Sequence, residues 1–379
     1  MAESPHRSRR DLLKAIGASA SIAALGACTP GTNAPKYARP LSRKPFIAPR
    51  VSKDRIIRTI VGLRPFRPSG FLVRRDEFDD KTVIHNYGHG GGGITLSWGS
   101  SALAVREAAN LKPGSAAVVG GGIMGLSTAR LLQDAGWQVT IYTRDMSRHS
   151  TSNIGAGHWS PTSVFDEGVP SAEYIARHQW AARISHHAFQ NLSGADYGIK
   201  WIENYYLGQE PIGEAFEHKG IEDLFPSTAD LEPHEHPFPV PYVMRDVTMI
   251  VQPATYLRRI RDDFYRAGGK FIIKNFKSRN EVLSLGESVI FNCTGLGAGE
   301  LFDDDELVPI SGQLVFLPPD PAVNFCTIGG GEGVLYMFPR KGEILLGGTF
   351  DRGNWSTQPD SNEVDRIVEE HRKLFTSFE

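Results

Sequence analysis

The stretch that most constrains this chain is a glycine-rich turn between a predicted strand and a predicted helix. Residues 116–119 are small or branched apolar residues, typical of a buried strand, and Gly120, Gly122 and Gly125 follow in the pattern G-x-G-x-x-G. Helical periodicity comes next, and a second apolar run at 138–143 completes a β-α-β unit. Such glycines allow a tight turn, the approach of backbone amides to a pyrophosphate, and close packing of helix and strand. Because phosphates bind well at the positive end of a helix, the pattern predicts dinucleotide binding.

The composition limits the class of protein. The chain has 379 residues, which is long enough for about two domains with a sizeable core. It is 40% hydrophobic and 22% charged with a formal charge of -2, so the charge balance gives no reason to expect a nucleic-acid partner. The three cysteines, Cys28, Cys293 and Cys326, exclude a disulfide framework, and no apolar run is long enough to span a bilayer.

The first residues predict export rather than folded structure. Residues 8–14, S-R-R-D-L-L-K, resemble the twin-arginine export motif, and a small-residue apolar stretch follows at 15–27. The sequence ending at Cys28 resembles a lipobox, in which that cysteine is lipidated and becomes the mature N-terminus. We therefore expect an export signal at 1–27, a linker at 28–50, and a lipid-anchored protein in the periplasm or on the outer face of a bacterial membrane. A Sec-type signal or a disordered tail is the alternative.

Hydrophobic periodicity predicts an α/β fold for the rest of the chain. Strands are expected at residues 71–74, 82–85, 288–295, 313–317, 335–338 and 343–350. Helices are expected at residues 94–110, 172–190 and 253–267. The triplet His234-Glu235-His236 lacks the further ligands of a zinc site, so a solvated loop is favoured and no metal is expected.

Several blocks together resemble the D-amino-acid oxidase family, FAD-dependent flavoproteins that include the D-aspartate oxidases. The blocks lie at residues 62–68, 83–98, 118–125, 151–161, 289–299 and 347–355. Two of them, H-N-Y-G-H-G-G and G-G-T-F…G-N-W, are specific to that family rather than to flavoproteins at large. The resemblance implies a Rossmann-like FAD-binding domain plus a substrate domain with a mixed, largely antiparallel sheet. NAD(P) in place of FAD is disfavoured, because the blocks outside the dinucleotide unit match the flavoprotein family.

The order of these blocks differs from that of the family. In relatives the dinucleotide unit comes first, whereas here the blocks at 62–68 and 83–98 precede it. We therefore expect a circular permutation, with the family's termini joined through residues 110–115 and a new opening between Glu379 and the linker before Arg50. A fragment whose missing end is supplied upstream by coincidence is the alternative. The expected segments are 59–164 and 246–305 for the FAD-binding domain, and 165–245 and 306–379 for the substrate domain.

The resemblance assigns the substrate contacts to residues far apart in the chain. Arg64 matches the arginine that clamps the substrate carboxylate, and a planar guanidinium suits this because it donates two parallel charge-assisted hydrogen bonds. Tyr336 matches the tyrosine whose hydroxyl holds the same carboxylate, and the carbonyl of Gly91 matches the acceptor for the substrate amine. A surface salt bridge for Arg64 and a buried, satisfied hydroxyl for Tyr336 are the alternatives.

The resemblance also implies contacts to FAD. They come from the glycine-rich turn and the helix after it, from hydroxyl groups near the pyrophosphate, and from loops near the flavin ring. The expected residues are Gly120, Gly122, Ile123, Met124, Gly125, Ser150, Thr151, Ser152, Gly157, His158, Gly90, Gly91, Gly92, Gly93, Ile94, Thr95, Thr294 and Gly295. Asp145 is the candidate for the ribose, although Arg144 and Asp145 stand in the opposite order to many relatives.

Together these expectations predict FAD-dependent oxidative deamination of D-amino acids to 2-oxo acids, ammonia and hydrogen peroxide, with dioxygen as the electron acceptor. Phe350 stands where D-aspartate oxidases have a basic residue, which favours neutral side chains, while His158 and Arg352 keep the activity of a D-aspartate oxidase open. A D-amino-acid dehydrogenase with another acceptor and a D-amino-acid binding protein without turnover also stay open. The sequence does not fix the oligomeric state.

Overall fold

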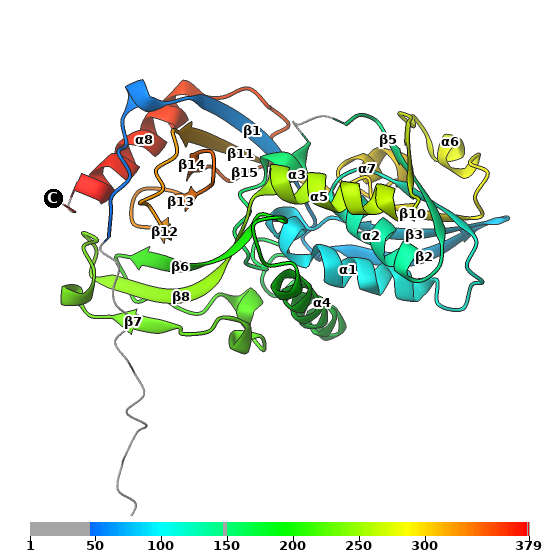
Figure 1. Ribbon diagram of the computed structural model, residues 1–379, viewed down its shortest axis with the longest axis horizontal. Helices are drawn as coiled ribbons and strands as arrows, with labels where there is room; N and C mark the ends of the chain where they lie inside the picture. Colours follow the sequence, from blue (N-terminus) through cyan, green and yellow to red (C-terminus); the bar gives the residue numbers. More distant parts are fainter. Residues whose placement is uncertain (1–45, 147–149, 377, 379) are drawn as a thin grey trace, which may run out of the picture. The chain divides into compact units, whose positions relative to one another are not determined.

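Two β-sheets organise the part of the chain that the structure describes (Figure 1). The structure is a computed structural model, and it describes residues 46–146, 150–376 and 378. Residues 46–379 form one compact unit. The predicted export signal at 1–27, Cys28 and most of the predicted linker lie outside the described residues. Within the described part, no helix combines the length and the apolar character needed to cross a membrane.

The smaller sheet contains the β-α-β unit that the glycine pattern predicts. Its strand order is β2 (Leu72–Phe78), β3 (Lys81–Tyr87), β10 (Val289–Asn292), β4 (Ser115–Val119), β5 (Gln138–Thr143) and β9 (Lys270–Ile273). Neighbouring strands run parallel, except that β2 pairs antiparallel with β3 at one edge. The apolar residues of β4 and all of β10 are buried, as strands inside a parallel sheet must be.

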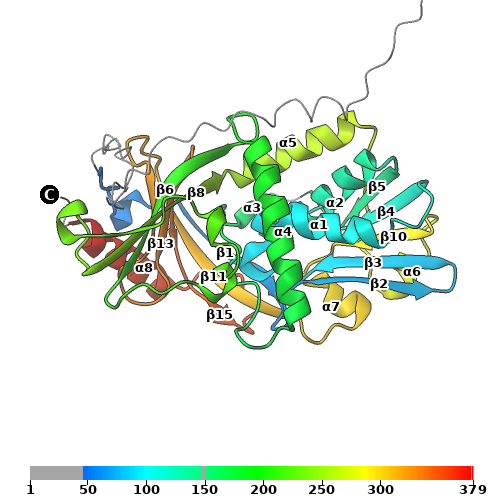
Figure 2. The same ribbon diagram turned by 90° about the horizontal axis from the view of Figure 1, so that it is seen from below.

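Helices complete the core around this sheet. They are α1 (Gly93–Glu107), α2 (Ile123–Asp134), α3 (Thr151–Ile154), α4 (Ala172–Asn191), α5 (Pro253–Arg266), α6 (Arg279–Leu283) and α7 (Gly297–Phe302). Figure 2 shows α4 running past α1, and the two helices are in contact. This close approach depends on Gly99 of α1, because a Cβ at that position would lie 1.9 Å from the carbonyl oxygen of Ala181.

The larger sheet has nine strands and is mostly antiparallel. Its order is β1 (Arg58–Phe66), β11 (Val308–Leu317), β14 (Ile344–Gly347), β13 (Tyr336–Pro339), β12 (Phe325–Gly329), β6 (Ile199–Gly208), β8 (Tyr242–Val251) and β7 (Ala229–Leu231), with β15 (Asp351–Arg352) paired to β11. Among its pairs, β12 and β6 run parallel. Short 3-10 turns cover Lys53–Arg55, Gly90–Gly92, Phe216–His218, Glu222–Leu224 and Pro233–Glu235.

The two faces of the larger sheet have different neighbours. On one face, Val315 and Met337 pack with the buried residues of α8 (Ser361–Thr376), which lies along this sheet in Figure 1. On the other face, Leu314 and Phe338 pack with Tyr336 and with Ile154 of α3. Alternate residues of a strand point to opposite faces. Tyr336 therefore lies on the face that adjoins α3, away from α8.

The α/β fold class is confirmed, and the sequence located most of the elements around the dinucleotide unit. It missed β1, β6, β7, β8 and β12 of the larger sheet and β9 of the smaller sheet. The helix expected at 94–110 ends at Glu107. The strand expected at 343–350 is only β14, which ends at Gly347, and β15 follows it outside that range. Between those two strands, the amide of Gln313 donates to the hydroxyl of Thr349 at 2.9 Å in place of a backbone ladder bond.

The predicted domain segments stay a prediction, but the sheets show where each segment lies. β1 falls in the expected FAD-binding segment 59–164 and pairs with β11 in the larger sheet. β8, most of which falls in the segment 246–305, pairs with β6 in the same sheet. α4, from the expected substrate segment 165–245, packs in the core around the smaller sheet. These three segments therefore each contribute to both parts of the fold, whereas the strands of segment 306–379 all belong to the larger sheet.

Candidate active site

The glycine-rich turn lies between β4 and α2, and each predicted glycine meets a different geometric requirement. Gly120 has φ +115°, and a Cβ there would lie 2.3 Å from the carbonyl oxygen of Cys293. A Cβ on Gly125 would lie 1.8 Å from the carbonyl oxygen of Gly120, so only glycine lets the helix start this close to the strand. At Gly122 the nearest atom to such a Cβ is the hydroxyl of Ser152 at 3.2 Å. The turn thus leaves the backbone at Gly122 accessible at the start of α2.

The hydroxyl residues predicted for the pyrophosphate gather at this helix start. The amide of Ile123 donates to Oγ of Ser152 at 3.0 Å. Thr151 donates from its hydroxyl to the carbonyl of Leu63 in β1 at 3.1 Å, which ties α3 to the larger sheet. Ser150 precedes α3, and its hydroxyl accepts a hydrogen bond from the side chain of Asn153 at 2.9 Å. Donors of this kind at a helix N-terminus suit a phosphate group.

The remaining residues predicted around the dinucleotide lie at the ends of neighbouring strands. Thr294 and Gly295 follow β10, and Gly295 has φ +59°. Asp145 follows β5 and pairs with Arg144 at 3.0 Å, so its role at the ribose stays a prediction. Met124 points into the core, where it is buried.

A second glycine-rich segment leads into α1. The amide of Gly91 donates to the carbonyl of Ser163 at 2.8 Å, and Gly91 itself is exposed. The backbone of Ser160 donates to the hydroxyl of Thr95 at 3.2 Å. Gly90, Gly92, Gly93 and Ile94 complete this segment. The hydrogen bonds join it to the loop that carries Gly157 and His158.

The two histidines of these segments are neutral packing residues. His89 stacks on Phe71 with ring centroids 4.8 Å apart, and burial lowers its pKa to about 3. His158 stacks on Phe338 at 4.9 Å, and burial lowers its pKa to about 4. Phe338 in turn stacks on Tyr336 at 5.0 Å. Neither imidazole therefore carries a positive charge near neutral pH.

Arg64 and Tyr336 meet although 272 residues separate them in the chain. Nη2 of Arg64 donates to the hydroxyl of Tyr336 at 3.4 Å, and Nη1 donates to the carbonyl of Thr349 at 3.4 Å. Both side chains are partly exposed. A carboxylate placed against this pair would accept from a guanidinium and a phenol together, which is a strong and directional arrangement.

Two glycines make room for this pair. A Cβ on Gly312, in β11, would lie 2.3 Å from Nη1 of Arg64. A Cβ on Gly347 would lie 2.1 Å from the ring of Tyr336. Gly347 belongs to a block that the sequence singled out, whereas Gly312 had no motif to identify it. At both positions a side chain would occupy the space of one of the two polar side chains.

Other cations near the site are already paired. Arg67 is held by Asp304 at 2.9 Å and by Glu306. Arg352 forms an ion pair with Asp166 at 2.8 Å. Arg340 was not predicted: it is buried, donates to the carbonyls of Gly155 and Ala156, and pairs with Glu343. Burial lowers the pKa of Arg340 to about 10, so it remains charged. It fixes the loop before His158 against the larger sheet.

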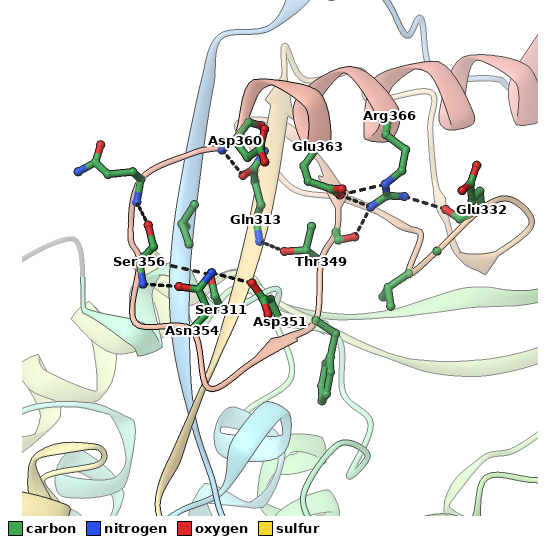
Figure 3. Close-up of a pocket in the computed structure, with 16 residues that line it drawn as sticks. Ser311, Gln313, Glu332, Thr349, Asp351, Asn354, Ser356, Asp360, Glu363 and Arg366 are labelled. Carbon is green, nitrogen blue, oxygen red and sulfur yellow. Dashed lines mark hydrogen bonds and ion pairs between the residues drawn. The ribbon is translucent and has the colours of Figure 1, made fainter.

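A hollow of about 610 Å³ (Figure 3) is lined by neither Arg64 nor Tyr336. Val61, Ser311 and Gln313 line it from β1 and β11, while Gly312 between the last two faces Arg64. Its remaining lining is mostly acidic and polar, and Arg366 reaches from α8 to Glu363. The hollow is therefore on the α8 side of the sheet, opposite Arg64.

Comparison with known proteins identifies the family of the chain. The model of the FAD dependent oxidoreductase family matches residues 115–379. The chain belongs to this family.

Relatives within this family are identical to the chain at about a quarter of the aligned positions. A D-amino-acid oxidase of Streptomyces coelicolor is 27% identical over 261 residues, covering 68% of this chain and 76% of its own. A human D-aspartate oxidase is 25% identical over 258 residues, covering 66% and 73%. Among solved structures, glycine oxidase from Geobacillus kaustophilus superposes with a TM-score of 0.51 at 16% identity, covering 69% and 78%. The L-amino acid deaminase of Proteus vulgaris does so with 0.51 at 13%, covering 70% and 80%. These two structures support the fold alone.

The cofactor of this family is FAD, and the residues around the β4–α2 turn fit it. The turn offers accessible backbone at Gly122 and the free end of a helix dipole, where the pyrophosphate of a dinucleotide binds. The segment from Gly90 to Thr95 starts α1 in the same way, next to the loop with His158. Each of the two helix starts thus lies beside a loop that carries predicted residues, through Ser152 at α2 and through Ser160 at α1.

Proposed function

We propose that this protein oxidises D-amino acids to 2-oxo acids and ammonia, with dioxygen as the electron acceptor and hydrogen peroxide as the second product. When bound, FAD would supply the two-electron oxidation of the substrate's Cα–N bond. The resulting imine then reacts with water to give the 2-oxo acid and ammonia. The observation that carries the proposal is the contact of Arg64 with Tyr336 at 3.4 Å on the sheet face that adjoins α3.

The chain's own residues would bind and orient the substrate. Arg64 and Tyr336 hold the carboxylate, and the carbonyl of Gly91 accepts a hydrogen bond from the amine. The neutral state of His89 and His158 leaves these imidazoles without a charge that would compete for the carboxylate. No side chain has to act as a strong base, because an uncharged amine can be oxidised directly.

The surroundings of Arg64 favour substrates without an acidic side chain. The ring of Phe350 lies 5.8 Å from Cζ of Arg64, at the position where D-aspartate oxidases would need a cation. The two residues that kept an acidic substrate in consideration are engaged otherwise, since Arg352 pairs with Asp166 and His158 is neutral. A second carboxylate therefore lacks an available partner among these residues.

Peroxide formation tests this proposal against a dehydrogenase that uses another acceptor. The purified full-length protein, supplied with FAD, should release hydrogen peroxide with D-alanine and none with L-alanine. Reduction of the flavin by D-alanine without peroxide would instead identify the dehydrogenase. No reduction by any D-amino acid would contradict the proposal and favour a binding protein.

We also propose that the chain is circularly permuted relative to its family. The family match begins at Ser115, the first residue of β4, yet β3 lies inside the same sheet beside β10. The first and last described residues lie side by side, with the rings of Phe46 and Phe378 6.1 Å apart. A chain rearranged to begin at Ser115, with residue 379 joined to residue 46, should therefore bind FAD and oxidise the same substrates. Failure of this rearranged chain to fold would contradict the permutation.

We further propose export and lipid anchoring, on the twin-arginine pattern at residues 8–14 and the lipobox ending at Cys28. In bacteria that export by this route, the protein should fractionate with membranes after passing the inner membrane. Cys28→Ser should release it in soluble form. Retention of that variant on the membrane would contradict the anchor.

A further inference from the structure

A row of polar side chains lies on the face of the larger sheet that carries Tyr336. In the strand register, Asp246 of β8 pairs with Asn204 of β6, and Asn204 pairs with Cys326 of β12. Two residues along, Tyr206 pairs with Ile328, which pairs with Tyr336. Directly paired residues share a face of the sheet. All of these side chains therefore face the same side as Tyr336 and away from α8.

Two members of this row are buried without hydrogen-bond partners of good geometry. Asn204 is 0% exposed and Asp246 is 3% exposed. Among the described residues, neither Oδ1 nor Nδ2 of Asn204 has such a partner, and neither has Oδ1 of Asp246 or Nε2 of His158. A buried polar group without a partner costs free energy, so native proteins rarely leave several of them together. Asn204 lies next to Asp246, His158 and Tyr206, but its contacts with them do not have hydrogen-bond geometry. A donor from another molecule would therefore improve the hydrogen bonding of this group.

The row carries a negative charge without a counter-charge. Burial raises the pKa of Asp246 to about 6, so its carboxylate is ionised near neutral pH. The imidazole of His158, which lies next to Asn204, is neutral because burial lowers its pKa to about 4. No ion pair to Asp246 occurs within the described part of the chain. A ligand that satisfies this carboxylate would bring a cationic donor.

The position of the row relative to Tyr336 sets the length of that ligand. Neighbouring strands lie about 4.8 Å apart, so Tyr206 is about 10 Å and Asp246 about 14 Å across the sheet from the strand of Tyr336. A methyl side chain on a substrate held by Arg64 and Tyr336 stays close to those two residues. The ammonium of lysine or the guanidinium of arginine extends towards β6 and β8.

We infer that Asp246, Asn204 and Tyr206 form the subsite for the substrate's side chain, and that it takes D-amino acids whose long side chain ends in a cationic donor, such as D-arginine and D-lysine. This inference rests on the proposed oxidation of D-amino acids and narrows its substrate class. Asp246 accepts from the cation, while the amide of Asn204 and the hydroxyl of Tyr206 complete its hydrogen bonds. Acidic side chains are excluded by repulsion from Asp246.

The first test compares substrates that differ only in the end of the side chain. For the full-length protein with FAD, kcat/KM should be about tenfold or more higher with D-arginine or D-lysine than with D-norleucine, which is similarly long but apolar. Asp246→Asn keeps the shape and removes the charge, so the ratio of D-arginine to D-alanine should fall by about tenfold or more. Glu203 precedes Asn204 in β6 and therefore points to the opposite face of the sheet. Glu203→Gln removes a charge there and should leave that ratio unchanged.

A second measurement needs no variant and uses probes that are not themselves oxidised, with D-alanine as the substrate. Competitive inhibition by 5-guanidinopentanoate, which is arginine without its α-amine, should be about tenfold or more stronger than inhibition by heptanoate. Equal inhibition constants would mean that water fills the subsite and would overturn the inference. Oxidation of D-alanine with no preference for the cationic substrates, or an unchanged ratio in Asp246→Asn, would overturn it while leaving the proposed function intact. Absence of flavin reduction by any D-amino acid would overturn both.

Discussion

Gly312 lies directly against the guanidinium of Arg64, and a Cβ at this position would come within 2.3 Å of Nη1. Gly312 sits in the middle of β11, where glycine otherwise weakens a strand. Glycine is needed at this position because the guanidinium of Arg64 occupies the space that a side chain would take. The relation makes a strand glycine part of the substrate clamp, although it bears no functional group.

Gly312→Ala should displace Arg64 from Tyr336 and lower kcat/KM for the best D-amino-acid substrate by about a hundredfold, because small misplacements of a positioning group are costly. FAD binding should persist, because the turn at Gly120 follows a strand of the smaller sheet whereas Gly312 lies in the larger sheet. Gly213→Ala is the matched control, because a Cβ there meets nothing within 4 Å. Equal activity of Gly312→Ala and Gly213→Ala would show that a methyl group at residue 312 does not displace the guanidinium.

Tyr336→Phe should raise KM by about tenfold and change kcat little. The hydroxyl binds the carboxylate equally in the ground state and the transition state, which is the pattern of uniform binding. Steady-state kinetics with a D-amino acid at fixed oxygen measure both constants. Tyr197→Phe removes a hydroxyl that contacts Asp263 on another part of the chain and serves as the control. A large fall in kcat for Tyr336→Phe would instead place its hydroxyl in the chemical step.

Gly125→Ala should abolish FAD binding and destabilise the fold by about 1–3 kcal/mol, the usual cost of overpacking. The added Cβ would lie 1.8 Å from the backbone oxygen of Gly120, so α2 has to move away from the turn. The visible flavin spectrum and urea unfolding report the two effects. Gly114→Ala adds a methyl group in open space and should keep the spectrum. A normal flavin spectrum for Gly125→Ala would contradict the tight turn.

Acid should destabilise the protein between about pH 6.5 and 4. Burial lowers the pKa of six histidines in the described part of the chain to about 3 or 4: His85, His89, His158, His178, His218 and His371. In this range the unfolded chain binds more protons than the native one, so the free energy of unfolding falls as the pH falls. Burial raises the pKa of Asp246 to about 6 and also raises that of Glu217, so these two carboxyl groups act in the opposite direction but are outnumbered by the six histidines.

Urea unfolding at several pH values measures this effect. The midpoint should be highest near pH 7, decline steadily below pH 6.5, and decline less from these groups below about pH 4. A midpoint that is constant or rises between pH 6.5 and 5 would show that the histidines are protonated in the native protein.

Local patterns in the sequence were enough for the dinucleotide unit and for the two substrate-binding candidates. The G-x-G-x-x-G spacing fixes the β4–α2–β5 unit through short-range constraints, and Gly120 and Gly125 have the geometry that the pattern requires. Arg64 and Tyr336 were found by resemblance to family blocks. Their contact across 272 residues could not be derived from spacing, because it depends on which strands pair.

Strand pairing also explains what the sequence did not reveal. β6 and β8 lack a clear alternation of polar and apolar residues, since one face packs under α8 and the other meets the polar row at Asn204 and Asp246. Cross-strand neighbours decide the environment of such residues more than intrinsic preference does. The roles of Gly312 and Asp246 therefore followed only from the strands that pair with β11 and β8.

The central claim is that Arg64 and Tyr336 hold a D-amino acid against bound FAD, and anaerobic titration of the flavin spectrum tests it most directly. Without oxygen, a D-amino acid should bleach the flavin of the wild-type protein, and the L-enantiomer should not. In Arg64→Lys, half-maximal bleaching should require about a hundredfold more substrate, because lysine cannot replace the bidentate guanidinium. Equal bleaching by both enantiomers, or an unchanged requirement in Arg64→Lys, would contradict the account.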